Sequence, residues 1–382
     1  MAKIDRIERI MEGFDPVRNG LGADFLLTKY TAMKGCGCKV PRGDLLQLLE
    51  TFKTDLVINN DEVDIGLDSC VIPLRHKNLR LVQTTDFFYP LIEDPYIMGR
   101  VTCANVLSDL YAMGVSECDN MLMLLGVAVD LNESQRDVVV RQFIEGFKDA
   151  ADEADTKIRG GQTVRCPWLL LGGVASSVVH ETEVIKVDRA VPGDVLVLTK
   201  PIGGQVAVNF YEWMKKNNGK VEELGLDAQK IKRAFKQVCE QMSRLNRNAA
   251  KLLHKYEAHS STDITGFGLL GHAENLARVQ LNPVEFVIDH LPIIEYMDEI
   301  ADKMIENGGK GFNLFQGRSA ETSGGLLVAM SAENATKYIR ELSTTDNAPA
   351  WIIGRVIEKE TDTVARIINN ATRISVPFPH FK

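Results

Sequence analysis

The 382-residue chain lacks the features that mark membrane, nucleic-acid-binding and disulfide-rich proteins. Its longest apolar run, residues 168–179, is interrupted by glycine and is too short to span a bilayer. Its net charge is −8, whereas binding of nucleic-acid phosphates requires a basic face. Its seven cysteines are irregularly spaced and form no CxxC pair, which indicates neither a disulfide framework nor a zinc knuckle. We therefore expect no membrane span and no nucleic-acid partner.

The N-terminal residues, MAKIDRIERIMEGFDPVRNG, alternate charged and apolar side chains. They contain no apolar core of the kind that a secretory signal has. Together with the cysteine pattern, this absence predicts a soluble protein in a reducing compartment, most simply the cytosol.

The length predicts two domains, because single hydrophobic cores seldom grow beyond roughly 250–300 residues. Charged residues precede Val191-Pro192-Gly193-Asp194, after which the pattern of strands and helices starts again, so we place a boundary near 180–192. We expect a mobile segment over 1–45, an N-terminal α/β domain over 46–188 and a C-terminal α+β domain over 189–382.

The spacing of apolar residues predicts helices and strands that alternate in both halves, which is typical of a mixed class of α and β structure. The expected helices cover residues 3–12, 45–52, 95–113, about 140–151, 205–216, 227–255, 269–277, 293–306 and 331–343. The expected strands cover residues 63–72, 79–86, 121–129, 169–179, 195–199, 284–288, 325–330 and 351–356.

Residues 33–41, MKGCGCKVP, place two thiols close to two lysines and two glycines. A nearby lysine favours the thiolate, which is the nucleophilic form of cysteine. Glycine lets the backbone lie close against a ligand. The interpretations open at this point are a reactive loop, an idle loop, and a redox pair of Cys36 and Cys38, although a CxC disulfide is strained.

Four aspartates, Asp68, Asp86, Asp109 and Asp263, stand at the ends of apolar elements in hydroxyl- or glycine-rich surroundings. Carboxylates in such places are costly unless they are paired or bind a metal. Hard divalent cations such as Mg²⁺ take oxygen ligands of this kind, often together with substrate phosphates. The alternative for each aspartate alone is a helix cap or a turn, but the set of four favours a metal site used in phosphoryl transfer.

A glycine-rich stretch, Gly160-Gly161-Gln162-Thr163, is predicted to form a turn between two strands. Such a turn can direct backbone N–H groups toward an anion. The stretch matches neither the Walker motif nor GxGxxG, so alone it is a weak indication. His254, His259 and His272 show no metal-ligand spacing, and we interpret them as structural or solvent-facing.

In their residues and their order, six motifs resemble those of the selenophosphate synthetases, also called selenide, water dikinases. They are KGCGCKVP (34–41), GLD (66–68), QTTD (83–86), ANVLSDLYAMG (104–114), GGQT (160–163) and STDITGFG (261–268). The resemblance covers nearly the whole chain except its first twenty or so residues.

This resemblance implies a two-domain α+β fold of the aminoimidazole ribonucleotide synthetase (PurM-like) type. It also implies a homodimer in which N-terminal-domain strands close a barrel, with ATP near the interface. The implied reaction makes selenophosphate from selenide, ATP and water, releases AMP and orthophosphate, and supplies activated selenium for selenocysteine. It requires Mg²⁺, while a need for K⁺ and a selenide-delivery protein stay open.

Carried over by motif, the catalytic residues are Cys36 and Lys39, and the metal ligands are Asp68, Asp109 and Asp263. The implied nucleotide contacts are Lys39, Gly66, Leu67, Asp68, Asp86, Asp109, Gly160, Gly161, Gln162 and Thr163. Our hypothesis is that Cys36 handles or shields selenium in a lid that closes over the γ-phosphate, while Lys39 neutralises phosphate charge. Cys38 either assists or only packs. The rival is a regulatory or ATP-hydrolysing paralogue without synthetase activity, against which the presence of Cys36 argues.

Overall fold

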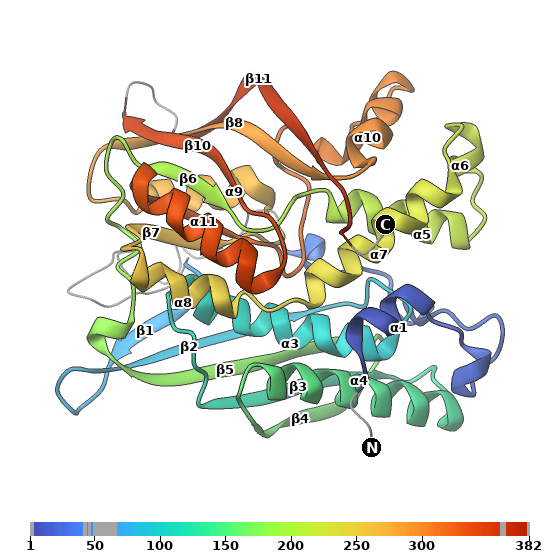
Figure 1. Cartoon of the computed structure of the whole chain (residues 1–382). Coiled ribbons are helices and arrows are strands. Elements are labelled where there is room, and N and C mark those ends of the chain that lie inside the picture. The colour runs from blue at the N-terminus through green and yellow to red at the C-terminus, as the bar shows by residue number, and fades with distance from the viewer. Residues whose placement is uncertain (1–3, 41–43, 45–46, 49–66, 360–363, 380–382) are drawn as a thin grey trace.

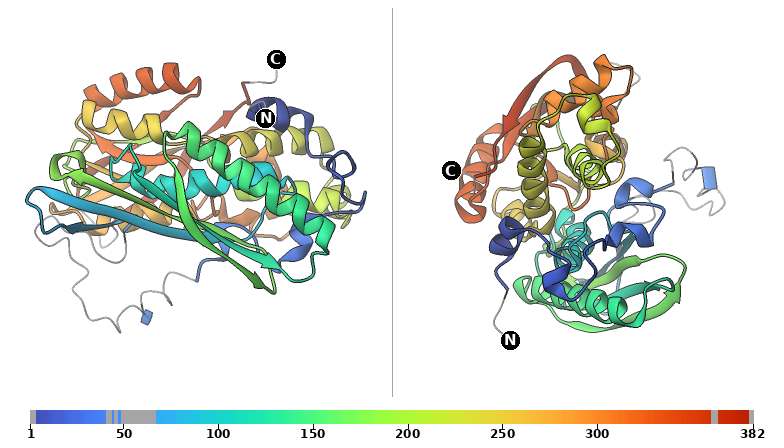
Figure 2. Two further views of the ribbon diagram at one scale, coloured as in Figure 1. Left: turned by 90° about the horizontal axis from the view of Figure 1, so that it is seen from below. Right: turned by 90° about the vertical axis from the view of Figure 1, so that its right-hand side faces the viewer.

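The computed structural model describes residues 4–40, 44, 47–48, 67–359 and 364–379. These residues form two layers, each built on one β-sheet (Figures 1 and 2). The mixed class predicted from the alternating pattern is therefore confirmed. The expected helix at 45–52 and the first part of the expected strand at 63–72 lie largely outside the described residues.

The N-terminal layer is a five-stranded sheet with the strand order β1-β2-β5-β3-β4. Neighbouring strands are antiparallel, except β3 and β4, which run parallel. The strands are β1 (Cys70–Pro73), β2 (Leu79–Phe88), β3 (Asn120–Ala128), β4 (Ile158–Cys166) and β5 (Leu170–His180). Helices α3 (Pro95–Ala112) and α4 (Glu133–Glu153) pack together on one face of this sheet (Figure 1).

Helix α3 lies between the two layers and carries part of the site. It begins as the sequence predicts, because Asp94 accepts hydrogen bonds from the backbone N–H groups of the first turn and Pro95 needs no such partner. Every residue of α3 except Asp109 is buried. Helix α4 can approach closely because Gly146 has no side chain, and a Cβ there would lie 1.9 Å from the carbonyl oxygen of Tyr96.

The C-terminal layer is a six-stranded sheet with the order β11-β8-β10-β6-β9-β7. Its described strands are β6 (Val195–Leu198), β7 (Ser260–Asp263), β8 (Val284–Ile294), β9 (Leu326–Met330), β10 (Trp351–Glu358) and β11 (Ala365–Val376). The helices of this half are α5 (Gly204–Lys215), α6 (Lys220–Glu223), α7 (Ala228–Ser243), α8 (Arg247–Lys255), α9 (Gly268–Arg278), α10 (Met297–Glu306) and α11 (Ala332–Asp346).

The N-terminal segment connects both layers. Helix α1 (Arg6–Glu12) forms where the sequence predicts a short helix, and it packs against α7. Short 3₁₀ turns follow, and the third of them is η3 (Cys36–Cys38). The backbone N–H of Gly35 donates to the carbonyl oxygen of Tyr89 at 2.9 Å, which fixes this turn beside the end of β2.

The structure corrects several expected elements. The predicted turn at Gly160–Thr163 is wrong, because these residues lie inside strand β4. The long helix expected over 227–255 is interrupted between Ser243 and Arg247 and forms α7 and α8. Helix α6 forms between the expected helices at 205–216 and 227–255, and α6 and strand β11 are elements that the periodicity did not predict.

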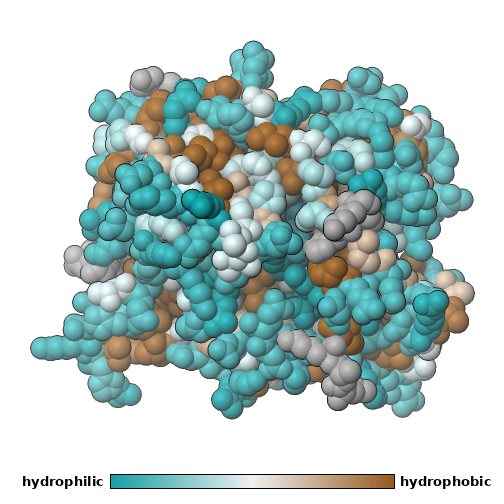
Figure 3. Space-filling view, in the orientation of Figure 1, coloured by the Kyte–Doolittle hydropathy of each residue, from teal (hydrophilic) through white to brown (hydrophobic). Residues whose placement is uncertain are grey.

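The face of the molecule seen in Figure 3 is mainly hydrophilic, with separate apolar patches. Within the described residues, helices long enough to cross a bilayer are not apolar enough to do so.

Candidate active site

A pocket of about 390 Å³ opens between the two layers and collects residues from separate parts of the chain. Six predicted site residues line it: Lys39, Leu67, Asp68, Asp86, Asp109 and Asp263. The other lining residues are Cys70, Gln83, Thr84, Thr85, Thr262, Thr265, Phe267, His272 and Asn275. The lining is therefore rich in carboxylates and hydroxyls, and Lys39 is its only lysine among the described residues. We call it the aspartate pocket.

Asp263, at the end of β7, is the most deeply buried of these carboxylates. Asp263 is 1% exposed, and its Oδ2 atom has no hydrogen-bond partner among the described residues. Burial raises the pKa of Asp263 to about 6, although a hydrogen bond from Ser108 and the charge of Lys39 act against this rise. An unpartnered, buried carboxylate oxygen is the kind of atom that a cation satisfies.

Asp68 and Asp109 lie near enough to share the field of Asp263. Burial first, and then the charge of Asp263, raise the pKa of both carboxyl groups well above the usual range. Thr262 donates a hydrogen bond to Asp68 at 3.0 Å, and Thr84 donates one to Asp109. Three carboxylates in mutual repulsion, one buried and two partly buried, need either protons or a bound cation.

Asp86 is held differently from these three carboxylates. It accepts hydrogen bonds from the Asn105 side-chain amide at 2.6 Å and from the backbone N–H of Phe87 at 2.9 Å. The ammonium of Lys39 lies 4.0 Å from its Oδ2 atom. Burial alone would lower the pKa of Lys39, but the surrounding carboxylates, with Asp86 foremost, raise it above its usual value. Lys39 is thus a charged group at the rim of the pocket.

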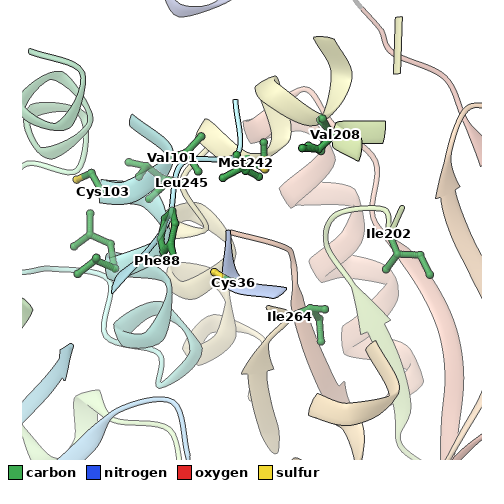
Figure 4. Close-up of a cluster of buried hydrophobic side chains, with 14 of the residues drawn as sticks. Cys36, Phe88, Val101, Cys103, Ile202, Val208, Met242, Leu245 and Ile264 are labelled. Atoms are coloured by element: carbon green, nitrogen blue, oxygen red, sulfur yellow. The ribbon is translucent and has the colours of Figure 1, made fainter. Parts of the chain in front are cut away.

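Cys36 is buried behind the aspartate pocket and does not line it. It is 1% exposed and belongs to the apolar cluster that includes Phe88 and Ile264 (Figure 4). Its thiol donates to Asn105 Oδ1 over 3.6 Å, and its backbone N–H donates to Thr322 Oγ1 at 3.3 Å. Asn105 therefore bridges the thiol and Asp86.

Burial, followed by the charge of Asp86, raises the pKa of the Cys36 thiol well above its usual value. In this conformation Cys36 is therefore a protonated thiol, although a nearby lysine is expected to favour the thiolate. The nearest lysine, Lys39, does favour the thiolate, but its field is weaker than the cost of desolvating the sulfur.

The sulfur of Cys38 contacts the backbone of Lys34 and not the thiol of Cys36. This sulfur lies 2.9 Å from both the backbone N and the carbonyl oxygen of Lys34. Both cysteines are free thiols. The geometry thus gives no support to a redox pair.

One predicted group of nucleotide contacts does not line the aspartate pocket of its own chain. Gly160, Gly161, Gln162 and Thr163 lie in the exposed edge strand β4, outside the lining of this pocket. Gly66 lies outside the described residues.

The sequence reasoning missed His272. Ligand atoms of Asp68, Asp263 and His272 lie within 4.8 Å of one another, although His272 Nε2 also accepts a hydrogen bond from the backbone N–H of Thr265 at 3.1 Å. No spacing rule could find this group, because its members come from three separate segments. Asn105 stands in the motif at 104–114, but its position between Cys36 and Asp86 is visible only in the structure.

The donor set fits Mg²⁺. Asp68, Asp109 and Asp263 offer the oxygen ligands that this cation prefers. The unpartnered Oδ2 atom of Asp263 and the raised pKa values of the three carboxyl groups both indicate that a cation would stabilise the arrangement.

Comparisons with known proteins identify the family. The profile "AIR synthase related protein, N-terminal domain" matches residues 66–179, and "AIR synthase related protein, C-terminal domain" matches residues 191–366. The fold expected from the motifs is therefore confirmed. A solved structure of the hydrogenase maturation protein HypE in complex with ATP shares this fold, with a TM-score of 0.56 at 17% identity over 93% of this chain and 98% of its own.

Two curated relatives are much closer in sequence. The "Selenide, water dikinase 3" of Danio rerio is 47% identical over 96% of this chain and 89% of its own length. The "Probable selenide, water dikinase" of Caenorhabditis elegans is 81% identical over 98% of this chain and 99% of its own length. The chain therefore belongs to the selenide, water dikinase family and is an enzyme of that type.

Proposed function

We propose that this enzyme makes selenophosphate from selenide, ATP and water in the aspartate pocket, releases AMP and orthophosphate, and so supplies activated selenium for selenocysteine. The observation that carries the proposal is the unpartnered Asp263 carboxylate oxygen, which lies among further, partly buried carboxylates in a pocket rimmed by the charged Lys39. Catalysis of phosphoryl transfer consists mainly of positioning and charge neutralisation, and this pocket offers groups for both.

Asp68, Asp109 and Asp263 would hold Mg²⁺. Bound there, the cation would neutralise negative charge on the phosphate oxygens of ATP. Asp86 is a poorer candidate ligand, because both of its oxygens already accept hydrogen bonds from Asn105 and Phe87. Its proposed role is to fix Lys39 and to bind the nucleotide together with Leu67. A contribution of K⁺ would add to this charge balance.

Lys39 acts on the phosphates directly. Its ammonium is kept charged by the surrounding carboxylates and is partly exposed at the pocket rim. A fixed positive charge placed beside the transferred phosphoryl group stabilises the transition state more than the ground state, because negative charge is redistributed there.

Cys36 handles selenium behind the wall of the aspartate pocket. Its thiol is protonated and buried, and Asn105 connects it to Asp86 on the pocket wall. An apolar, dry position suits a polarisable selenium atom and keeps water away from it. The same seclusion protects the phosphorylated product from hydrolysis while the second phosphate bond is cleaved.

A homodimer would bring Gly160–Thr163 to a nucleotide. These residues lie on the exposed edge strand β4, away from the aspartate pocket of their own chain. The N-terminal sheet also exposes large apolar side chains on four strands, namely Ile72, Phe87, Val164 and Val178. Apolar groups on an otherwise exposed sheet face favour its burial against a second copy. We therefore assign the Gly160–Thr163 contact to ATP bound by the partner protomer.

Phosphorus NMR tests the reaction. Protein is incubated without oxygen with ATP, Mg²⁺ and selenide under reducing conditions, and we expect signals of AMP, orthophosphate and selenophosphate. Cys36→Ser serves as the control and should lose selenophosphate while it retains ATP binding. Formation of AMP without selenophosphate by the unaltered protein would overturn the proposal in favour of an ATP-hydrolysing paralogue.

A further inference from the structure

A second, smaller cavity of about 200 Å³ lies on the other side of the η3 turn. Its lining includes Lys34, Gly37 and Cys38 from the turn region, Val208 from α5, Met242 from α7 and Thr322. Among the residues that the structure describes, the linings of this cavity and of the aspartate pocket have no member in common. The turn therefore separates two cavities, with Lys39 on one side and Gly37 and Cys38 on the other.

Hydrogen bonds connect Cys36 to the walls of both cavities, although Cys36 lines neither of them. Its backbone N–H donates to Thr322, whose side chain lines the smaller cavity. Its thiol donates to Asn105, which in turn donates to Asp86 in the aspartate pocket. The sulfur thus occupies the wall between the two spaces.

The chemistry of the smaller cavity differs from that of the aspartate pocket. Glycine, leucine, valine and methionine supply much of its wall, and Val208 and Met242 belong to the same apolar cluster as Cys36 (Figure 4). The one ammonium among the described lining residues, that of Lys34, is paired with Glu212. Burial, followed by the charge of Lys216, lowers the pKa of Lys34 to about 8. No carboxylate lines this cavity among the described residues.

The apolar wall and the paired lysine of the smaller cavity suit a small anion with a single charge better than a triphosphate. A triphosphate carries several negative charges and needs more cations than one paired lysine provides. Hydroselenide is a small, polarisable anion with a single charge, and it is weakly enough hydrated to enter a largely apolar space. The absence of carboxylates from the described lining removes the repulsion that the same anion would meet among the aspartates of the other pocket.

We propose that hydroselenide enters through this smaller cavity, so that selenide and ATP approach Cys36 from opposite sides of the η3 turn. The inference rests on the proposed synthetase reaction and adds a separate selenide site to it. We call this space the selenide cavity. Binding there is non-covalent, with the Cys38 thiol as a soft neighbour and Lys34 as the counter-charge, because Lys34 shares the single carboxylate of Glu212 with Lys216.

Filling the selenide cavity tests this assignment. Val208→Phe and Asn209→Phe both place a ring in or beside it, and Asn209 is less buried, so this variant remains informative if Val208→Phe does not fold. Met214→Phe is the matched control, because Met214 lies on the same helix but outside the cavity. We expect the KM for selenide to rise about tenfold in the filled variants, which corresponds to about 1.4 kcal/mol, while the KM for ATP stays within about twofold. An unchanged KM for selenide in a folded, filled variant, or an equal rise of both KM values, overturns the assignment.

A second experiment does not depend on activity. Crystals are soaked with hydrogen selenide without oxygen, and selenium is located by its anomalous scattering. A selenium peak beside Gly37, Cys38 and Val208 supports the selenide cavity, whereas a peak only among the aspartates, or none, refutes it. If a peak appears in the cavity but the protein yields no selenophosphate by NMR, then the proposed reaction fails and the binding site stands.

Discussion

Replacement of Asp263 by asparagine should stabilise the metal-free protein while it removes metal binding. Asp263 is buried, and its pKa is raised from 3.8 to about 6. The folded protein therefore holds this proton more tightly than the unfolded chain does. As a result, the free energy of unfolding falls as the pH rises from about 4 to about 6 and then levels off. At pH 7.5 the ionised carboxylate costs roughly 3 kcal/mol, at about 1.4 kcal/mol for each tenfold change in proton affinity.

Asp263→Asn removes this cost and keeps the shape of the side chain. An unfolding entropy of about 2.1 cal/mol/K for each of the 382 residues converts roughly 3 kcal/mol into a rise of about 4 °C in Tm. We expect this rise in EDTA at pH 7.5, and about half of the gain in free energy at pH 5. In Mg²⁺ the order should reverse, because only the unaltered protein gains stability from the cation.

Thermal and denaturant unfolding at the two pH values, with EDTA or with Mg²⁺, measures these effects. Asp137→Asn is the matched control, since Asp137 is exposed on α4 and its removal changes the net charge equally. The reasoning fails if Asp263→Asn brings no gain in EDTA at pH 7.5, or if the gain is the same at both pH values.

Three further substitutions separate the roles within the site. Lys39→Met should lower the rate of AMP release by about 100-fold or more, because it removes the fixed charge beside the phosphates, and a near-normal rate would exclude that role. Asp109→Asn should raise the Mg²⁺ concentration needed for half-maximal activity by about tenfold or more, and an unchanged titration would remove Asp109 from the ligands. In Gly266→Ala, the new Cβ would lie 2.4 Å from the carbonyl oxygen of Cys36, so it should displace the η3 turn. We expect loss of selenophosphate with ATP affinity kept within about threefold, whereas full synthesis would show that the position of the turn is unimportant.

Local signals predicted those elements whose ends are set by neighbouring residues. Asp94 and Pro95 start α3 by capping and by a fixed backbone angle, and both effects can be recognised in the sequence. Asp227 likewise caps α7, because its side-chain oxygen accepts a hydrogen bond from the backbone N–H of Gln229 at 2.7 Å. In such cases the physical cause lies within one turn of the chain.

Elements set by distant contacts could not be predicted in this way. Gly160-Gly161 looks like a turn, but Gly161 lies in a strand, where a Cβ would lie 1.9 Å from the carbonyl oxygen of Met123 on β3. Because Gly161 has no side chain, strands β3 and β4 can approach each other closely at this point. Similarly, the helix expected to 255 is interrupted where the Asn246 side chain bonds to Ser108 and to the carbonyl oxygen of Gly324, which are far away in the sequence.

The same distinction applies to the site. The aspartates stand in recognisable motifs, and the structure brings Asp68, Asp109 and Asp263 into one pocket. The thiol state of Cys36 could not be read from its neighbours, because burial by α3 and by the loop of Thr322 outweighs the adjacent lysine. His272 carries no signal in the sequence, since only folding brings it to the aspartates.

The central claim is that the aspartate pocket binds the metal and the ATP phosphates next to Cys36. A crystal structure with Mn²⁺ in place of Mg²⁺ and a non-hydrolysable ATP analogue tests it most directly, because manganese is located by its anomalous signal. We predict manganese bound to Asp68, Asp109 and Asp263, with the γ-phosphate facing Lys39. Manganese and phosphates bound elsewhere, with these three carboxylates free of metal, would contradict the account.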